Sequence, residues 1–240
     1  MINIDSMKCC GCHACAEICP TNFISMEKDR EGFMYPALNG QKQCIDCKLC
    51  EQVCPLINGA NDEKNFERGF IVQNTDENIR RQSTSGGAFT AIAEIIMENG
   101  GIVYGATYGD NFHVMHKCVH EKAELGLFRN SKYVQSDLTG IFREIRSKLK
   151  SGTLICFSGT PCQVEGLKCF LRRDYDNLVT VDVVCHGVSS PLIWDKYLEF
   201  NQMQKRDFDW IYFRDKHFGY KYSTMTHSKD NKTVYAEGVE

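Results

Sequence analysis

The sequence predicts an α/β fold in two parts: a small dicluster ferredoxin-like domain, followed by a larger α/β domain with a mainly parallel sheet. One cysteine spacing occurs twice before residue 55. After a polar stretch at 58–65, apolar strand patterns alternate with amphipathic helix patterns. A chain of 240 residues is long enough for one small and one larger unit. We place the two domains at 1–62 and 66–240.

Each cysteine run reads Cys-x2-Cys-x2-Cys-x3-Cys-Pro, the spacing found in two-cluster iron–sulfur proteins. The first three cysteines of such a run bind one 4Fe–4S cluster and the fourth binds the other. We therefore expect the first cluster on Cys9, Cys12, Cys15 and Cys54, and the second on Cys44, Cys47, Cys50 and Cys19. Zinc is the alternative, but structural zinc sites favour paired Cys-x2-Cys motifs over triplets. Cys10 is left over and is expected not to be a ligand.

The segment between the two runs, residues 22–43, is expected to form a β-hairpin, because apolar stretches flank a polar one at 27–32. Each run also predicts a short helix that ends at its Cys-Pro pair, since proline cannot continue a helix. A unit of this size has little apolar core. We therefore expect bound clusters to supply much of its folding energy.

The larger domain is predicted to alternate between strands and helices. Strands are expected at 70–73, 102–106, 111–119, 153–157 and 178–184, and helices at 87–98, 138–149, 161–172 and 191–203. Further β-structure is expected at 210–213 and 220–226. The apolar strands 153–157 and 178–184 bracket a helix, a pattern that favours a right-handed crossover between parallel strands.

The composition excludes several classes of protein. A net charge of -3 gives no indication of binding to nucleic acid or to an anionic membrane surface. No apolar stretch reaches the roughly 18 residues that span a bilayer, and no secretory signal is visible at the N-terminus. With 14 cysteines and no export signal, a reducing cytoplasm is the expected location.

Two short motifs are candidate binding sites in the larger domain. Ser85-Gly86-Gly87 stands just before a predicted helix, where backbone N–H groups can bind an anion such as a flavin phosphate. A plain helix cap explains these residues equally well.

The second motif is Thr160-Pro161-Cys162, which follows a buried strand. Thr160 can cap a helix and Pro161 suits its first position, so Cys162 falls in the first turn, where the helix dipole favours a thiolate. Cys162 is then a metal ligand or a redox thiol, or else a small buried residue. Cys185 ends the next strand and could face Cys162, because ligands gather at the carboxyl ends of parallel strands. Cys156 and Cys169 are expected in the core.

A third group of candidate residues lies in and just after the predicted strand 111–119, whose side chains point alternately to its two faces. His116, Cys118 and His120 share a face of that strand, which makes a zinc site conceivable, but an outward polar face is the favoured interpretation. No Ser-His-Asp set, P-loop or Gly-x-Gly-x-x-Gly motif is found, and the sequence names no catalytic acid or base.

The chain resembles the coenzyme F420 hydrogenase/dehydrogenase beta-subunit family with an N-terminal dicluster ferredoxin. The similarity is carried by five motifs: Ser85-Gly-Gly-Ala88, Ser131-Lys-Tyr-Val134, Gly159-Thr-Pro-Cys-Gln163, Val181-Asp-Val-Val-Cys-His-Gly187 and Phe213-Arg-Asp-Lys216. The resemblance implies FAD in the α/β domain and a third 4Fe–4S cluster beside it, with Cys162 and Cys185 as two ligands. It also implies that Ser85, Gly86, Gly87 and Lys132 lie near the flavin.

The resemblance further implies an iron–sulfur flavoprotein oxidoreductase. Electrons would pass between a hydride carrier (a deazaflavin-like or nicotinamide coenzyme), FAD and the clusters, and then to or from a redox partner protein or ferredoxin. Family members carry a further Cys-x2-Cys after the Arg-Asp-Lys segment. None follows Lys216 here, so we expect a domain that is C-terminally incomplete.

The alternative function is a ferredoxin-type electron-transfer protein without substrate chemistry of its own. Proteins with this fused ferredoxin also resemble ones associated with polysaccharide biosynthesis. The presence or absence of bound flavin distinguishes the two functions.

Overall fold

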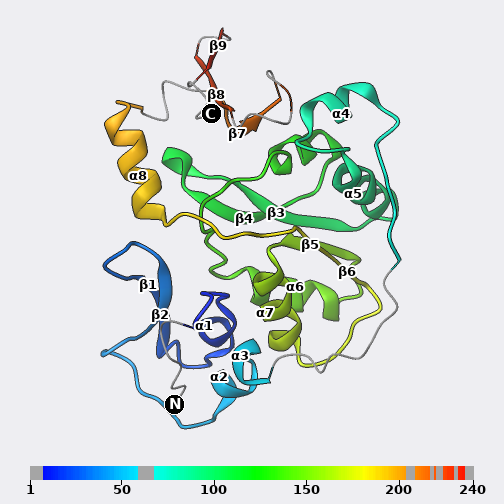
Figure 1. Cartoon of the computed structure of the whole chain (residues 1–240). Coiled ribbons are helices and arrows are strands. Elements are labelled where there is room, and N and C mark those ends of the chain that lie inside the picture. The colour runs from blue at the N-terminus through cyan, green and yellow to red at the C-terminus, as the bar shows by residue number, and fades with distance from the viewer. Residues whose placement is uncertain are drawn as a thin grey trace.

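The computed structural model describes residues 8–58, 68–203, 209–216, 219, 224–229 and 232–235. The predicted domain boundary near residue 62 lies outside these ranges. The N-terminal unit contains the short helices α1 (Ala14–Ile18), α2 (Leu49–Gln52) and α3 (Pro55–Asn58) and the strands β1 (Ile24–Lys28) and β2 (Met34–Leu38) (Figure 1). As predicted, a short helix precedes each Cys-Pro pair.

The predicted hairpin between the two cysteine runs is confirmed. Strands β1 and β2 pair antiparallel, with Ile24 opposite Leu38 and Lys28 opposite Met34. Asp29 holds the turn, because its Oδ1 accepts hydrogen bonds from the backbone N–H groups of Glu31 and Phe33, both at 2.9 Å. A side-chain acceptor of this kind stabilises a tight turn.

The larger domain is built on a mainly parallel four-stranded sheet in the order β4-β3-β5-β6. Its strands are β3 (Ile102–Tyr108), β4 (Val114–Val119), β5 (Ile155–Gly159) and β6 (Leu178–Asp182). Strands β3, β5 and β6 run parallel to one another, and β4 pairs antiparallel with β3 at one edge. The crossover from β5 to the parallel β6 passes through α7 (Pro161–Leu171), as predicted.

Helices cover both faces of this sheet, and the side chains of β5 show how. Ile155 and Phe157 point into a core formed with α6 (Ile141–Lys150) and α7, whereas Cys156 points into a separate core formed with α5 (Ala88–Glu98). This alternation is the period of two that a strand imposes. The expected core position of Cys156 is confirmed, whereas Cys169 is half-buried and packs against the core.

The remaining elements connect to or pack around this sheet. They are α4 (Glu77–Gln82), the 3-10 helices η1 (Asp110–Phe112) and η2 (Lys122–Phe128), α8 (Pro191–Phe200), and an antiparallel sheet of β7 (Ile211–Asp215), β8 (Thr224–Lys229) and β9 (Lys232–Tyr235). A third apolar cluster, which includes Trp194 and Ile211, joins α8 and β7 to the main domain. No helix among the described residues is long and apolar enough to cross a membrane.

Three sequence predictions need correction. Residues 70–73 form no strand: they pass beside the glycine turn, where the N–H of Asn74 donates to the carbonyl of Gly86 at 2.7 Å. The strand predicted from residue 111 begins at Val114, because Asn111 and Phe112 adopt left-handed backbone angles. Strand β6 is half-buried rather than buried, because it lies at the edge of the sheet.

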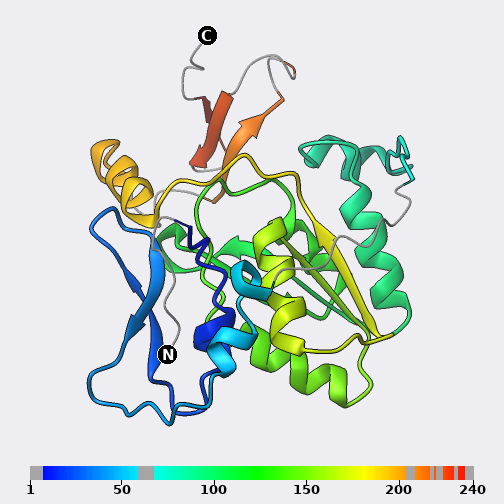
Figure 2. The same cartoon turned by 60° about the horizontal axis from the view of Figure 1, so that its bottom comes forward.

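The N-terminal unit packs against α6 and α7 (Figures 1 and 2). The main polar contact is made by Glu17 of α1, whose carboxylate accepts hydrogen bonds from the N–H groups of Gly140 at 2.8 Å and Arg143 at 3.3 Å. These N–H groups belong to the first turn of α6, where a negative charge is favoured. Arg143 in turn donates to the carbonyls of Glu17, Ala16 and Cys19. Each domain therefore caps a helix end of the other.

Apolar and backbone contacts complete the interface. At Gly166 of α7, a Cβ would lie 2.9 Å from Cβ of Cys12, so a side chain there would displace the cysteine loop. Gln135 is buried and bonds to both backbone groups of Met34, accepting from its N–H at 2.6 Å and donating to its carbonyl at 3.1 Å. The N-terminal unit is thus held at Cys12 by α7 and at Met34 of β2 by Gln135.

We predict that Glu17→Ala lowers the free energy of unfolding by about 1–3 kcal/mol, because two N–H groups at a buried helix start lose their acceptor. The measurement is urea unfolding of the cluster-loaded protein. The matched control is Glu31→Ala, which removes an exposed carboxylate on the hairpin turn and should change stability by less than about 0.5 kcal/mol. Equal stabilities for the two variants would contradict the role of Glu17.

Candidate functional site

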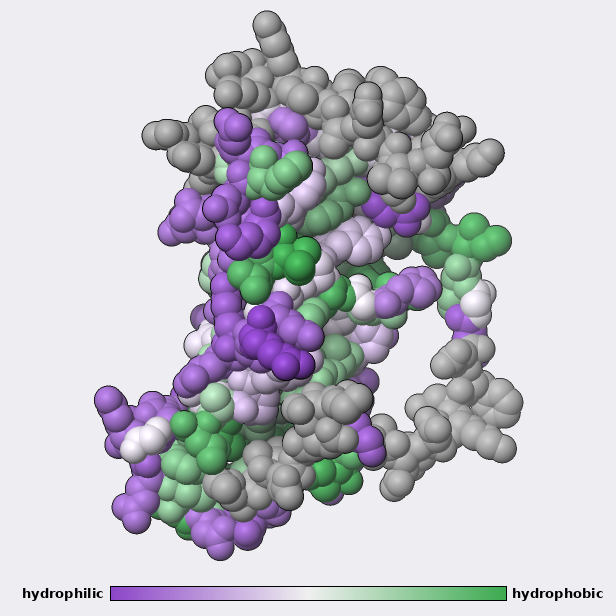
Figure 3. Space-filling view, turned by 60° about the vertical axis from the view of Figure 1, so that its left-hand side comes forward, coloured by the Kyte–Doolittle hydropathy of each residue, from purple (hydrophilic) through white to green (hydrophobic). Residues whose placement is uncertain are grey.

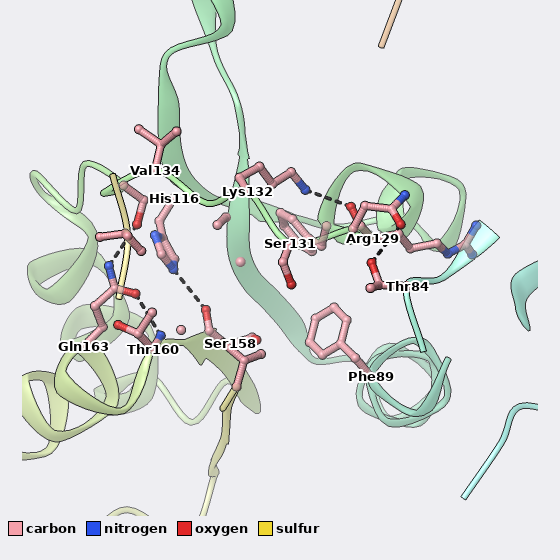
Figure 4. A pocket seen from close by; sticks show the side chains of 18 of the residues that line it. Thr84, Phe89, His116, Arg129, Ser131, Lys132, Val134, Ser158, Thr160 and Gln163 are labelled. Atoms are coloured by element: carbon pink, nitrogen blue, oxygen red, sulfur yellow. Dashed lines mark hydrogen bonds between the residues drawn. The ribbon is translucent and has the colours of Figure 1, made fainter. Parts of the chain in front are cut away.

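A cavity with a volume of about 540 Å³ lies at the carboxyl end of β5. Most of its walls come from four segments of the larger domain (83–90, 105–106, 128–136 and 158–163). The other lining residues are Val72, His116, Val183 and Val188 of the same domain and Cys10, Gly11, Phe33 and Tyr35 of the N-terminal unit. Figure 4 shows the side chains of Phe89, His116, Ser131 and Thr160 around this space. The volume is typical of small-molecule and cofactor sites.

The glycine turn predicted from the sequence forms one wall of this pocket. Gly87 caps the N-terminus of α5, which begins at Ala88, so the predicted helix start is confirmed. A Cβ on Gly86 would lie 2.5 Å from the carbonyl oxygen of Val72, and only glycine fits there. Thr84 Oγ1 donates to Asn130 Oδ1 at 3.0 Å and joins the turn to the segment that carries Lys132.

Lys132 lies in the opposite wall. Its ammonium donates hydrogen bonds to the carbonyls of Leu127 at 2.7 Å and Arg129 at 2.9 Å, and lies 5.7 Å from the ring centre of Tyr108. Burial lowers the pKa of Lys132 to about 7, because charge is disfavoured away from water. Lys132 can therefore gain or lose a proton near neutral pH.

His116 also lines the pocket, and here the sequence interpretation was wrong. The expected outward polar face is buried at this residue, whose exposed fraction is 1%. The ring stacks on Phe157, with centres 5.4 Å apart, and Nε2 donates to the carbonyl of Ser158 at 3.0 Å. Burial lowers the pKa of His116 to about 4, so the ring is neutral, and Nδ1 has no hydrogen-bond partner among the described residues.

The other residues of that predicted face have separate contacts. The thiol of Cys118 lies 3.6 Å from His120 Nε2 and 3.7 Å from a carboxylate oxygen of Glu144. No group of three or more His, Cys, Asp or Glu side chains in the described ranges is arranged to hold a single metal ion.

The eight cysteines of the two runs surround two separate hollows. The first hollow is lined by Cys9, Cys12, Cys15 and Cys54, and the second by Cys19, Cys44, Cys47 and Cys50. Each hollow thus combines three thiols of one run with the fourth of the other. This is the arrangement that the spacing predicts for two 4Fe–4S clusters. All eight thiols are free of disulfides, as cluster ligands must be.

The first hollow and the large pocket share a wall. Cys10 and Gly11 line both, whereas none of the residues that line the second hollow lines the pocket. Sequence reasoning left Cys10 without a role. The sequence feature that could have drawn attention to Cys10 is the adjacent pair Cys9-Cys10, because a ligand run uses only the first of these two thiols.

The structure places Cys162 in the first turn of α7, as predicted. Its helix begins at Pro161, and Gln163 Oε1 accepts a hydrogen bond from the N–H of Thr160 at 3.0 Å. The neighbouring thiol of Cys10, followed by burial, raises the pKa of Cys162. Cys185 is exposed and is not among the residues that line the pocket. That Cys185 faces Cys162 stays a prediction.

Exposed apolar side chains occur on both domains. Figure 3 shows apolar patches among hydrophilic residues on the face that carries α8 and the β1–β2 hairpin. The large exposed apolar residues include Leu38, Ile45, Ile193 and Phe200.

Two family models match this chain. Residues 8–57 match the 4Fe-4S dicluster domain, and residues 152–237 match the C terminus of the coenzyme F420 hydrogenase/dehydrogenase beta subunit. The first match covers both cysteine runs. The second begins just before β5 and includes Cys162.

Curated relatives agree with these matches. The chain is 26% identical over 171 residues to a coenzyme F420-dependent sulfite reductase of Methanocaldococcus jannaschii, a match that covers 69% of this chain and 25% of the relative. The chain thus spans a quarter of the length of that reductase. It is also 35% identical over 54 residues to an uncharacterized ferredoxin of the same organism, covering 22% of this chain and 68% of the ferredoxin.

A similar solved structure is a chain in the xenon-derivatized F420-reducing NiFe hydrogenase complex from Methanosarcina barkeri. The superposition has a TM-score of 0.49 at 18% identity and covers 68% of this chain and 58% of that one. Together with the two-part α/β fold, the family matches show that this chain belongs to a coenzyme F420 hydrogenase/dehydrogenase beta-subunit-like family, with a 4Fe–4S dicluster domain on its N-terminal side.

Proposed function

We propose that this chain is an iron–sulfur flavoprotein oxidoreductase of the cytoplasm. It passes electrons between a hydride-carrying coenzyme of the deazaflavin or nicotinamide type, FAD in the large pocket and two 4Fe–4S clusters. The observation that carries the proposal is the wall of Cys10 and Gly11, which separates the pocket from the first cysteine hollow. A cofactor in the pocket would be separated from the first cluster by this loop alone.

The pocket residues fit a planar ring with a phosphate tail. Aromatic side chains line the walls (Phe33, Tyr35, Phe89 and Phe128), and the glycine turn leads into the N-terminus of an 11-residue helix, which favours an anion. When bound there, FAD supplies the exchange between a hydride, which carries an electron pair, and clusters that accept single electrons.

Two buried bases in the pocket give the chain its own part in this chemistry. The neutral ring of His116 can accept a hydrogen bond at Nδ1 from an N–H or O–H group of the bound molecule. Lys132, with a pKa of about 7, can hold or release a proton beside it. A bound hydride carrier would therefore find a hydrogen-bond acceptor, Nδ1 of His116, and a side chain that can bind or release a proton, Lys132, in the same part of the pocket.

The two clusters take different positions in the proposed path. The set of Cys9, Cys12, Cys15 and Cys54 lies next to the pocket and is the proximal site. In the second set, Cys44 and Cys47 are exposed, so this distal site faces the redox partner protein or ferredoxin. A third cluster on Cys162 and Cys185 rests on the family resemblance alone.

A ferredoxin-type electron carrier without substrate chemistry, in the context of polysaccharide biosynthesis, is the second candidate. The exposed second cysteine loop favours it, because a docking electron carrier needs a cluster near its surface. In this case the larger domain would serve as a platform for the partner protein.

We predict that the protein purified without oxygen carries about one FAD per chain and about eight irons. The measurements are flavin fluorescence after acid release and iron analysis. Gly86→Ala should lower the flavin content several-fold and leave the iron content unchanged, because the added Cβ collides with the Val72 carbonyl in the pocket wall. Gly40→Ala is the matched control, since nothing lies within 4 Å of its added Cβ. If the parent protein held eight irons and no flavin, the flavoprotein proposal would be wrong and the electron-carrier function would remain.

We also predict how the cysteines divide between the clusters. Cys9→Ser and Cys54→Ser should each lower the iron content from about eight to about four, and the double variant should lower it no further. Combining Cys50→Ser with Cys54→Ser should remove nearly all iron, because these neighbours line different hollows. The control is Cys169→Ser, which keeps both clusters. If instead the Cys50/Cys54 double variant kept four irons, each run would bind its own cluster.

A further inference from the structure

Arg143 of α6 connects the larger domain to the end of the first cysteine run. Its side chain donates hydrogen bonds to uncharged acceptors of the N-terminal unit: the carbonyl of Glu17 at 2.6 Å, the carbonyls of Ala16 and Cys19, both at 3.1 Å, and Asn22 Oδ1 at 3.0 Å. No carboxylate among the described residues forms an ion pair with it, and that of Glu17 is turned to the backbone at the start of α6. Arg143 therefore brings a positive charge without a paired negative one to the turn at Cys19.

Cys19 belongs to the second cysteine set and lines the second hollow. Hydrogen-bonding groups lie beside two sulfurs of this set, because Thr21 Oγ1 is 3.7 Å from Cys19 Sγ and the N–H of Asp46 donates to Cys44 Sγ at 3.4 Å. The charged residues that line this hollow in the described part of the chain, Asp46 and Lys48, pair with each other at 2.8 Å. Their charges cancel, so the positive charge on α6 is not offset there.

The first cysteine set has different surroundings. None of the described residues that line its hollow is a Lys, Arg, Asp or Glu. Cys12, Cys15 and Cys54 of this set are buried, whereas Cys44 and Cys47 of the second set are exposed. The first set is therefore withdrawn from water and has no charged residue in its lining.

These surroundings act on reduction in opposite directions. A 4Fe–4S cluster gains one negative charge when it takes up an electron, and its potential depends on nearby charge, on hydrogen bonds to its sulfurs and on exposure to solvent. Burial disfavours the added negative charge, whereas a neighbouring cation, N–H donors and water favour it. A cluster on the second set should therefore be reduced more easily than one on the first.

We propose that Arg143 raises the reduction potential of the second cluster above that of the first, and thereby directs electrons from the pocket side of the molecule to the exposed second set. One electron leaves the first cluster, which is oxidised, and enters the second, which is reduced, while no bond or proton changes. The inference rests on the two clusters of the proposed function and is independent of its flavin and its hydride carrier.

The test is a redox titration of the full, cluster-loaded chain, purified without oxygen and followed by electron paramagnetic resonance. It is carried out at low ionic strength, because salt screens a partly exposed charge. The parent protein should show two midpoint potentials. Cys54→Ser, which is expected to keep the second cluster alone, should titrate at the higher of the two.

Two substitutions remove the positive charge in different ways. Arg143→Gln deletes it, and Asn22→Asp places a carboxylate where Asn22 Oδ1 accepts from the guanidinium at 3.0 Å. Both should lower the higher potential and leave the lower one near its parent value. Aspartate tolerates the left-handed backbone at position 22, where φ is 52°, so the second variant tests the charge even if the first loses iron.

Two further variants separate the charge of Arg143 from its shape. Arg143→Lys keeps the charge and loses the planar fork, so the higher potential should stay close to the parent value. Arg146→Gln removes an equal charge from the same helix, where the guanidinium lies 4.4 Å from the ring centre of Phe170, and should change neither potential. A contact that only held the turn in place would not follow this charge pattern.

Three results would overturn the inference. They are one common potential for both clusters of the parent protein, a second cluster that titrates at the lower potential, or parent potentials in Arg143→Gln and Asn22→Asp variants that hold about eight irons. A protein with two separate potentials but no flavin would contradict the proposed function and leave this inference standing. A flavin-containing protein whose clusters share one potential would do the reverse.

Discussion

The structure depends on the way α1 docks on α6 and α7. The carboxylate of Glu17 occupies the start of α6, and Arg143 returns hydrogen bonds to the carbonyls at the end of α1. These are charge-assisted bonds, and the carboxylate that accepts two of them is on the buried Glu17, where such a bond is stronger than on an exposed surface. They fix a small cysteine-rich unit, with little core of its own, against the large domain.

This docking gives the two cysteine hollows different surroundings. Gly166 lets α7 approach Cys12 closely, so the larger domain packs against the first hollow, whose lining residues belong to the N-terminal unit. The second hollow is formed within the N-terminal unit, near exposed thiols. Because protein surroundings and solvent exposure tune the potential of a cluster, two sites of identical spacing can differ in their redox properties.

The pocket combines a few polar groups with apolar walls. Burial shifts the pKa values of its two bases, His116 and Lys132, in the same direction. It lowers the pKa of His116 and of Lys132, since the charged form of each is the one that loses hydration. The outcomes differ because the two residues start from different ordinary values. His116 is neutral throughout the physiological range, whereas Lys132 titrates within it.

The sequence by itself determined the features that depend on local spacing. The cysteine runs predicted the two sets that surround the hollows, the glycine turn predicted the start of α5, and Thr160-Pro161 placed Cys162 in the first turn of α7. Each follows from residues close together in the chain, where hydrogen-bond geometry and ligand spacing act directly.

Only the tertiary structure decided which distant segments meet. The burial of His116 depends on Phe157 and Ser158 of another strand, and Cys10 lines the pocket of the larger domain because α1 docks on α6 and α7. Residues 70–73 have the pattern of a strand but pair with no sheet edge among the described residues. Burial and pairing are properties of the assembled fold, so a local pattern predicts the element and leaves its partner open.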